Sequence, residues 1–323
     1  MMDSLIYRLP YAEAVVKRQG RFELQLNGAE SVGFLVTDFL HQRIYAFEDQ
    51  GELDAFVPHD ISSKPVVISP RDYQIEAQGM LHAFPVMGVQ KAVYSRVKNV
   101  SFDWRSAESL FHGLVEKYPQ AFVYLISSPL FGTWIGATPE VLIDRKGLEI
   151  KTVALASTKS VDDESEWSKK DLDEHQFVVD ALDEVLNRNA CFSIEKDGPV
   201  AHQAGPVKHL ITRFSALLSK PNAWQIAMDL HPTPAVCGTP RMAALDLITS
   251  REMHDRELYT GVIGLFGEES RLFVNLRCAR LTEKMAYLFL GGGYTIDSIP
   301  DLEWEETEKK AKTLLNVMQE ISF

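Results

Sequence analysis

LGGGYTIDSIPDLEWEETEKKAKTLL, residues 290–315, joins a glycine-ended strand to an acidic helix, and the rest of the chain is organised around it. Three glycines, residues 291–293, close the apolar strand, and glycine lets a backbone approach a ligand closely. The helix is expected to begin at Asp301, with Glu303 and Glu306 on one of its faces. Two such carboxylates beside a glycine turn could hold a hard cation such as Mg²⁺. The other interpretation is an ordinary acidic first turn, which suits the positive end of the helix dipole.

Antiparallel strands lead into this stretch. Residues 259–267, 271–281 and 285–293 are rich in β-branched and aromatic residues, and short polar joins separate them. Joins of this length favour hairpins. Because strands joined by hairpins alternate with helices elsewhere in the chain, the sequence predicts an α+β fold of layered antiparallel sheets with flanking helices.

The rest of the chain contains the same two kinds of element. Further strands are expected at residues 21–26, 31–39, 43–47, 91–97, 122–129 and 149–157, with a strand and a hairpin over 131–147. Helices are expected at residues 70–84, 104–117, 167–188, 206–218, 222–229 and 240–250. The longest of these is predicted to bury His175, Val178, Val179, Leu182 and Leu186. No repeat or linker divides the chain, so residues 1–323 are predicted to form one domain.

Composition limits the class of protein. A chain of 323 residues with a net charge of −12 argues against nucleic acid and anionic membranes as partners, although a local basic pocket can still bind a small anion. Cys191, Cys237 and Cys278 have no metal-ligand or redox spacing, and a sparse, odd set favours a reducing cytoplasm. The N-terminus shows no signal-peptide pattern, and no apolar run approaches a membrane span in length. A cytoplasmic location is therefore expected.

Five residues elsewhere could carry chemistry, and each also has a structural interpretation. Lys91 is either an edge-strand lysine or a base made reactive by partial burial. Glu140 is either a solvated carboxylate or a general acid, and Glu174 is either a helix-surface charge or a third metal ligand. Arg277, expected within a strand, needs an anionic partner, either a structural glutamate or a substrate carboxylate. His231, before two closely spaced prolines, is by itself a turn histidine.

Together these stretches resemble the chorismate-binding enzymes, a family of isochorismate synthases, salicylate synthases and the synthase chains for anthranilate and aminodeoxychorismate. The resemblance implies the fold of anthranilate synthase component I. It runs from about residue 70 to the C-terminus, and residues 1–66 look shorter than in most members and carry no motif. The matching segments are QKAVYSR (90–96), GATPEVL (136–142), TVALAST (152–158), KDLDEHQFVVD (170–180), HLIT (209–212), LHPTPAVCGTP (230–240), DRELYTG (255–261), FVNLRCARL (273–281) and GGGYTIDSIPDLEWEET (291–307).

Within the family the sequence is most similar to isochorismate synthases of menaquinone and siderophore pathways, and this likeness implies catalytic roles. Lys91 would deprotonate the water that adds at C2 of chorismate, and Glu140 would protonate the departing C4 hydroxyl. Mg²⁺ would bind the ring carboxylate, held by Glu174 and Glu306, with Glu303 direct or through water. A dianionic substrate on an acidic protein needs such local positive charge.

The resemblance also implies a substrate-binding set, which consists of Arg277, Tyr259, His231, Ser157, Gly291 and Gly293. Arg277 and Tyr259, with backbone amides of the glycine turn, would hold the enolpyruvyl carboxylate. Ser157 stands where the family usually has glycine, and if its backbone amide contacts the substrate, its side chain must point away. Lys159 replaces a usual arginine and Cys237 a small residue, and these departures leave a non-catalytic chorismate-binding protein as an alternative.

Residue types separate the subclasses. The strand matching TVALAST has Ala154 and Ala156 where the aminodeoxychorismate enzymes carry a nucleophilic lysine, and the anthranilate enzymes lack a lysine at the position of Lys91. No amidotransferase segment is seen, and no such partner subunit is expected. We therefore predict a Mg²⁺-dependent isochorismate synthase serving menaquinone synthesis, a monomer or weak homo-oligomer, with salicylate synthase as the alternative.

Overall fold

Strands outnumber helices in the computed structural model, which describes residues 2–25, 32–204, 207–220 and 222–321. The first eight strands are β1 (Asp3–Arg8), β2 (Val16–Gln25), β3 (Gly33–Thr37), β4 (Ile44–Glu52), β5 (Lys91–Ser101), β6 (Phe122–Ser128), β7 (Gly132–Thr138) and β8 (Val141–Lys146). The others are β9 (Glu149–Ser160), β10 (Phe192–Ala204), β11 (Val207–Leu217), β12 (Gly238–Thr239), β13 (Val262–Phe266), β14 (Glu269–Val274), β15 (Cys278–Leu281) and β16 (Met285–Thr295).

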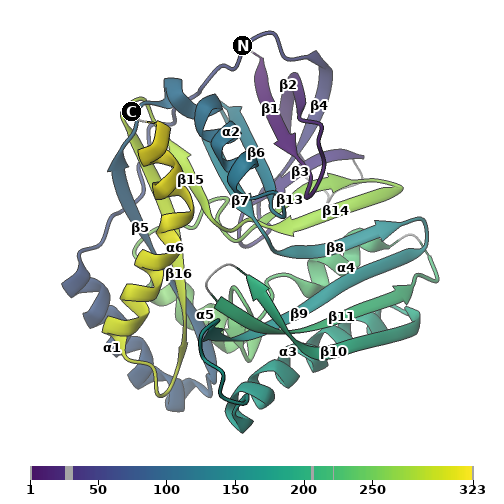
Figure 1. The fold of residues 1–323 in the computed structure, drawn as a ribbon, viewed down its shortest axis with the longest axis vertical. Helices are drawn as coiled ribbons and strands as arrows, with labels where there is room; N and C mark the ends of the chain where they lie inside the picture. The colour runs from purple at the N-terminus through teal and green to yellow at the C-terminus, as the bar shows by residue number, and fades with distance from the viewer. Residues whose placement is uncertain (1, 26–31, 205–206, 221, 322–323) are drawn as a thin grey trace.

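The helices flank these strands (Figure 1). They are α1 (Pro70–Met87), α2 (Ala107–Lys117), which follows a 3₁₀ turn at Trp104–Ser106, α3 (Lys169–Arg188), α4 (Ala223–Leu230), α5 (Arg241–Arg251) and α6 (Pro300–Ile321). None of the described helices is long and apolar enough to span a membrane. Six of the seven expected helices are thus confirmed to within a few residues. The expected strands are confirmed as well, apart from the one over 271–281 and apart from the ends of 21–26 and 31–39 that run into residues 26–31, outside the described residues.

All neighbouring strands in the sheet are antiparallel. The order is β10-β11-β9-β8-β14-β13-β3-β4-β2-β1-β6-β7-β15-β16-β5-β12. Strands far apart in this order, such as β3 and β16, contribute to one aromatic-rich core cluster, so the sheet folds back over itself in layers. The predicted α+β arrangement of layered antiparallel sheets with flanking helices is confirmed.

The helix expected over residues 206–218 is wrong. The described part of this range is β11, which pairs with β10, a strand that the sequence analysis did not predict. Leu210, Phe214 and Leu218 suggest helical spacing, but in the structure every second residue from Leu210 on is buried, and the polar Thr212 is one of them. Thr212 is tolerated inside because its hydroxyl forms a 2.8 Å hydrogen bond with the ring of His175. Because the polar Thr212 lies on the buried face, the alternation of apolar and polar residues that is typical of a strand is not apparent in the sequence.

The single strand expected over residues 271–281 is interrupted at 275–277, between β14 and β15. Asn275 is fully buried, where it accepts a hydrogen bond from Tyr124 at 2.6 Å and donates one to the carbonyl of Leu258 at 2.8 Å. Arg277 adopts a left-handed backbone with φ of 49°. The placement of Arg277 within a strand is therefore corrected, because the chain turns where the buried amide finds its partners.

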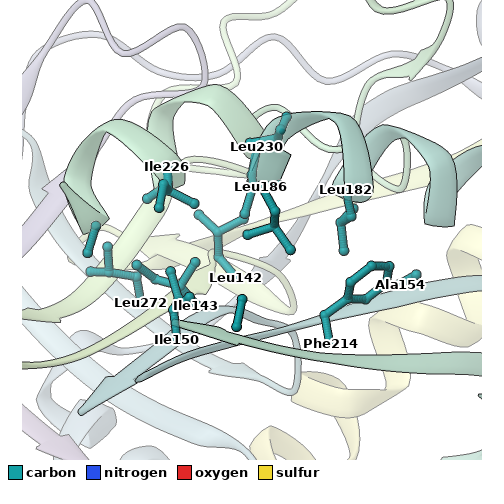
Figure 2. Close-up of a cluster of buried hydrophobic side chains, with 14 of the residues drawn as sticks. Leu142, Ile143, Ile150, Ala154, Leu182, Leu186, Phe214, Ile226, Leu230 and Leu272 are labelled. Carbon is teal, nitrogen blue, oxygen red and sulfur yellow. The ribbon is translucent and has the colours of Figure 1, made fainter. Parts of the chain in front are cut away.

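Helices α3 and α4 cover one face of β8, β9, β11 and β14. Figure 2 shows Leu182 and Leu186 of α3 and Leu230 of α4 directed at sheet residues that include Leu142 and Phe214. The stripe predicted for α3 is confirmed as buried, and it consists of His175, Val178, Val179, Leu182 and Leu186. This packing fixes the position of α3 relative to the sheet, and with it the position of the side chains on the remaining faces of α3.

Helix α6 lies along β16 and β5 (Figure 1). A buried arginine of β5, Arg96, fixes its rotation, because the guanidinium stacks 3.5 Å from the ring centre of Trp304 and donates to Thr307 at 2.8 Å. The same guanidinium is ion-paired with Glu308. With that face of α6 held on the sheet, the acidic residues of its first turns are placed beside the glycine run of β16.

Candidate active site

Lys91 and Glu174 form an ion pair where β5 meets α3. Lys91 is the first residue of β5 and lies opposite Thr295 of β16. The start of α3 is fixed by a capping box between Ser168 and Asp171. Lys91 Nζ donates to Glu174 Oε1 at 2.7 Å, and the two side chains are 17% and 27% exposed. Two residues that lie far apart in the sequence are thus brought together, in a contact that the sequence analysis did not predict.

Glu140 lies between β7 and β8, where its carbonyl accepts a hydrogen bond from the Val274 amide at 2.9 Å. Burial raises the pKa of its carboxyl group to about 7, although the charges of Arg277, Lys91 and Lys310 act to lower it. A carboxyl group with a pKa near neutrality retains a proton under physiological conditions. Glu140 is therefore suited to donate that proton.

Glu303 and Glu306 occupy one face of the first turns of α6. Ser298 donates to Glu303 Oε1 at 3.0 Å, whereas Glu303 Oε2 is buried without a hydrogen-bond partner among the described residues. Burial and the charge of Glu306 raise the pKa of Glu303 to about 7. For Glu306, burial acts to raise the pKa, but Lys310 and Arg277 outweigh it and the pKa is lowered. The pKa of Glu303 is therefore raised and the pKa of Glu306 is lowered, so Glu303 keeps its proton more readily than Glu306 does.

Lys310 also belongs to this site, and sequence reasoning missed it. It stands four residues after Glu306 and pairs with that carboxylate at 2.6 Å. Its Nζ donates to the carbonyl of Gly291 at 2.8 Å, which ties α6 to the glycine run. Burial and Arg277 lower the pKa of Lys310, while the two glutamates of the first turns act to raise it. The i, i+4 spacing in the quoted stretch was the available signal.

The glycine run lets functional side chains approach the backbone of β16. A Cβ atom at Gly291 would lie 2.7 Å from the hydroxyl of Tyr259, and one at Gly292 would lie 3.2 Å from Glu303 Oε2. Tyr259 is buried and stacks on the ring of Phe289, with 5.7 Å between ring centres. The glycines, which lie within β16, therefore leave room for Tyr259 beside the strand that also contacts α6, and the close approach to a ligand stays a prediction.

Replacing Gly291 with alanine is expected to displace the Tyr259 hydroxyl. The ring is packed on Phe289, so we expect the free energy of unfolding to fall by about 1–3 kcal/mol and the KM for substrate to rise. Gly293→Ala is the matched control, because its Cβ would meet only Lys91 Cε at 3.4 Å, an ordinary contact. Urea denaturation and steady-state kinetics of both variants test this. Equal stability losses would contradict the assigned contact.

Arg277 lies in the break between β14 and β15 and is surrounded by site residues. Burial, the largest influence, lowers the pKa of its guanidinium, and Tyr259, Glu140 and Glu306 act to raise it. All three of these neighbours belong to the predicted site. The structure therefore places Arg277 among the candidate acid, one candidate metal ligand and the candidate carboxylate-binding tyrosine.

Ser157 is the extra residue of a bulge in β9, since Ala156 lies opposite Leu210 and the next pair begins beyond it. Its φ is 57°, a left-handed conformation that favours the glycine usual at this position. The hydroxyl donates to the carbonyl of Asp171 in α3 at 2.7 Å. The side chain is therefore directed at α3.

His209 of β11 is a second residue that the sequence analysis did not single out. Its ring donates to the backbone of Ser157, and burial lowers its pKa, with the charges of Arg277 and Lys310 lowering it further. These influences place the imidazole beside the positive groups of the site. His209 was missed because its segment was interpreted as a helix.

His231 is not brought into this group. Its ring is 2% exposed, and its two nitrogens contact the ring of His41 and the carbonyl of Thr260. Burial lowers the pKa of His231 well below its usual value, so the ring is neutral. Both nitrogens are engaged within the protein, an arrangement that favours the interpretation as a turn histidine.

An open pocket of about 500 Å³ leads to Lys91 and Glu174. Phe177 of α3 lines it on one side, and Thr295 and Asp297 line it after β16. This volume lies within the range of small-molecule sites in proteins. The pocket gives a substrate access to the base candidate from the surface.

The predicted magnesium ligands Glu174, Glu303 and Glu306 offer the carboxylate oxygens that this cation prefers. Glu303 Oε2 is buried and unpartnered among the described residues, and the charge of Glu306 raises the pKa of Glu303. A cation bound between these two carboxyl groups would stabilise the charged form of each. Within the described ranges, however, no three His, Cys, Asp or Glu side chains are gathered closely enough to hold a metal ion as they stand. The oxygen atoms of the three glutamates are thus suitable ligands for Mg²⁺, and two of the glutamates, Glu174 and Glu306, form ion pairs with lysines.

The sequence profile of the chorismate binding enzymes matches residues 21–319 of this chain. The chain belongs to that family. Over 243 residues it is 32% identical to isochorismate synthase EntC of Escherichia coli, covering 71% of this chain and 62% of that protein. It is 29% identical over 262 residues to the vibriobactin-specific isochorismate synthase of Vibrio cholerae, covering 76% of this chain and 66% of that one. The match thus spans less than two thirds of either relative.

Solved structures confirm the chorismate-binding fold. The menaquinone-specific isochorismate synthase MenF of Escherichia coli aligns with a TM-score of 0.83 at 17% identity, covering 98% of this chain and 88% of that chain. Anthranilate synthase component I from Streptococcus pneumoniae aligns with a TM-score of 0.70 at 17% identity, covering 97% and 92%. Coverage of nearly the whole chain includes residues 1–66, for which the sequence offered no motif.

Proposed function

We propose that this family member is an isochorismate synthase, which converts chorismate to isochorismate. The observation that carries the proposal is the carboxyl group of Glu140, whose pKa burial raises to about 7 while the charge of Lys91, which lines the open pocket, acts to lower it. Adding water at one carbon while a hydroxyl leaves from another requires one group to take a proton and another to give one. The names of the relatives at 29% and 32% identity support the same reaction.

Each residue then has one task. The amine of Lys91 takes a proton from the water that forms the new bond at C2, and Glu140 gives its proton to the C4 hydroxyl, which leaves as water. The double bonds of the ring shift between these positions, so the net reaction is an isomerisation. Arg277 and Tyr259 hold the enolpyruvyl carboxylate beside the glycine run, where Tyr259 already approaches Gly291.

The proposal includes Mg²⁺ held by Glu174, Glu303 and Glu306. When bound, the ion supplies a divalent charge for the ring carboxylate of the dianionic substrate. Glu303 offers the buried oxygen that has no partner among the described residues. Lys310 and Arg277 add further positive charge, which an acidic protein needs at the site where it binds a dianionic substrate.

Product analysis with purified protein, chorismate and Mg²⁺, with and without EDTA, tests the function. We expect isochorismate by chromatography, and its loss when EDTA removes the ion. Salicylate together with pyruvate would assign the protein to the salicylate synthases instead. Chorismate binding without any product would show that the chain binds and does not catalyse, and turnover that persists in EDTA would contradict the metal requirement.

We further propose that the product serves menaquinone synthesis. Support comes from the sequence likeness to this class and from the 0.83 TM-score with a menaquinone-specific enzyme. Expression in two bacterial strains that lack isochorismate synthase, one scored for menaquinone and one for a catechol siderophore, tests this. Restoration of the siderophore alone would contradict the assignment, and it would agree with the vibriobactin-specific relative.

A further inference from the structure

The candidate metal ligands are engaged by lysines of the same site. Lys91 Nζ lies 2.7 Å from Glu174 Oε1, and Lys310 Nζ lies 2.6 Å from Glu306 Oε1. Both distances are typical of charge-assisted hydrogen bonds. Glu303 Oε2, by contrast, is buried without a hydrogen-bond partner among the described residues. Each ammonium therefore stands at one of the carboxylate oxygens to which a divalent cation would bind.

We propose that Lys91 competes with Mg²⁺ for Glu174, so that metal binding exchanges one cation for another and frees the lysine side chain to turn to the substrate. This inference rests on the proposed function for the identity of the ion and of the base. A carboxylate oxygen that accepts a short hydrogen bond from an ammonium group cannot give its full charge to a metal. The divalent ion attracts a carboxylate more strongly than the monovalent ammonium does at a similar distance.

The positions of the two residues suit such an exchange. Lys91 is the first residue of β5, where β5 lies between β16 and the short edge strand β12, and its long side chain is only partly buried. Glu174 lies in the second turn of α3, facing the open pocket. Lys91 also lies against Gly293, which leaves its side chain room to move along β16. The lysine can therefore leave the glutamate without disturbing the sheet or the helix.

The exchange predicts an unusual direction of effect, because removing a side chain should tighten metal binding. In Lys91→Met, a substitution of similar length, Glu174 has no competitor. We expect Mn²⁺, used as a paramagnetic probe of the substrate-free protein, to bind about tenfold tighter than to wild type, equivalent to about 1.4 kcal/mol. Lys91→Arg keeps a cation at the glutamate and is expected to stay near the wild-type affinity.

Lys169→Met is the matched control, because Lys169 lines the same pocket and its loss changes the local charge equally. It should alter Mn²⁺ affinity much less than Lys91→Met does. Equal tightening in both variants would reduce the effect to general electrostatics and overturn the proposal, as would weaker binding in Lys91→Met. Circular dichroism checks that each variant is folded.

The test also separates this inference from the proposed function. Mn²⁺ binding is measured by electron paramagnetic resonance without chorismate, so the result does not depend on turnover. If wild type makes isochorismate but Lys91→Met binds Mn²⁺ no more tightly, the exchange is wrong and the function stands. If Lys91→Met binds Mn²⁺ more tightly and wild type makes no isochorismate, the exchange holds and the assigned reaction is wrong.

Discussion

Lys91→Ala is expected to lower kcat for isochorismate formation by about 10²–10⁴-fold, the usual range for the loss of one positioned proton-transfer group. The side chain is partly exposed at the start of β5, so its removal should leave the fold intact. Glu174 then loses its ion-pair partner but remains next to the open pocket and can be solvated. Product formation by chromatography and the thermal unfolding midpoint should be measured on the same preparation.

Lys98→Ala provides the comparison on the same strand. Lys98 is ion-paired with Glu308 on the outer part of α6, and Glu308 keeps Arg96 as a second partner. We expect turnover close to wild type in this variant. Substantial turnover in Lys91→Ala would show that another group accepts the proton, whereas equal losses in both variants would point to damage to β5 and not to catalysis.

Local sequence signals were sufficient to predict the acidic first turns of α6. The i, i+3 spacing places Glu303 and Glu306 on one face whatever the helix packs against. The glycines before them were interpreted as sites where a ligand approaches the backbone, and in the structure the hydroxyl of Tyr259 lies close to Gly291. Such features depend on residues a few positions apart, so the sequence contains what is needed to predict them.

Features set by distant partners were not predictable in this way. The hydroxyl of Thr212 is buried in β11 only because His175 of α3 lies 2.8 Å away, and without that partner the segment resembles a helix. Arg277 leaves the strand because Asn275 finds its partners in other segments. The ion pair of Lys91 with Glu174 likewise depends on how α3 meets the sheet. The sequence identified these site residues through family likeness, not through their contacts.

The pH dependence of the reaction should report the proton on Glu140. Burial raises its pKa to about 7, so the protonated fraction falls about tenfold per unit as the pH rises above that value, and kcat should fall with it. Glu140→Gln cannot release a proton to the leaving hydroxyl. We expect its kcat to be lower by about 10²–10⁴-fold and its residual rate to lack the alkaline limb near pH 7.

Two other carboxyl groups have a raised pKa of about 7, Glu257 and Glu303, so the limb must be assigned by substitution. Glu257→Gln is the informative comparison, because Glu257 is buried and paired with Arg280 at 2.8 Å. It should keep the alkaline limb of wild type. If the limb vanishes in Glu257→Gln and persists in Glu140→Gln, the proton that leaves with the hydroxyl does not come from Glu140, and the acid must be sought elsewhere. If it vanishes only in Glu140→Gln, the burial of that one carboxyl group sets the pH range in which the enzyme works.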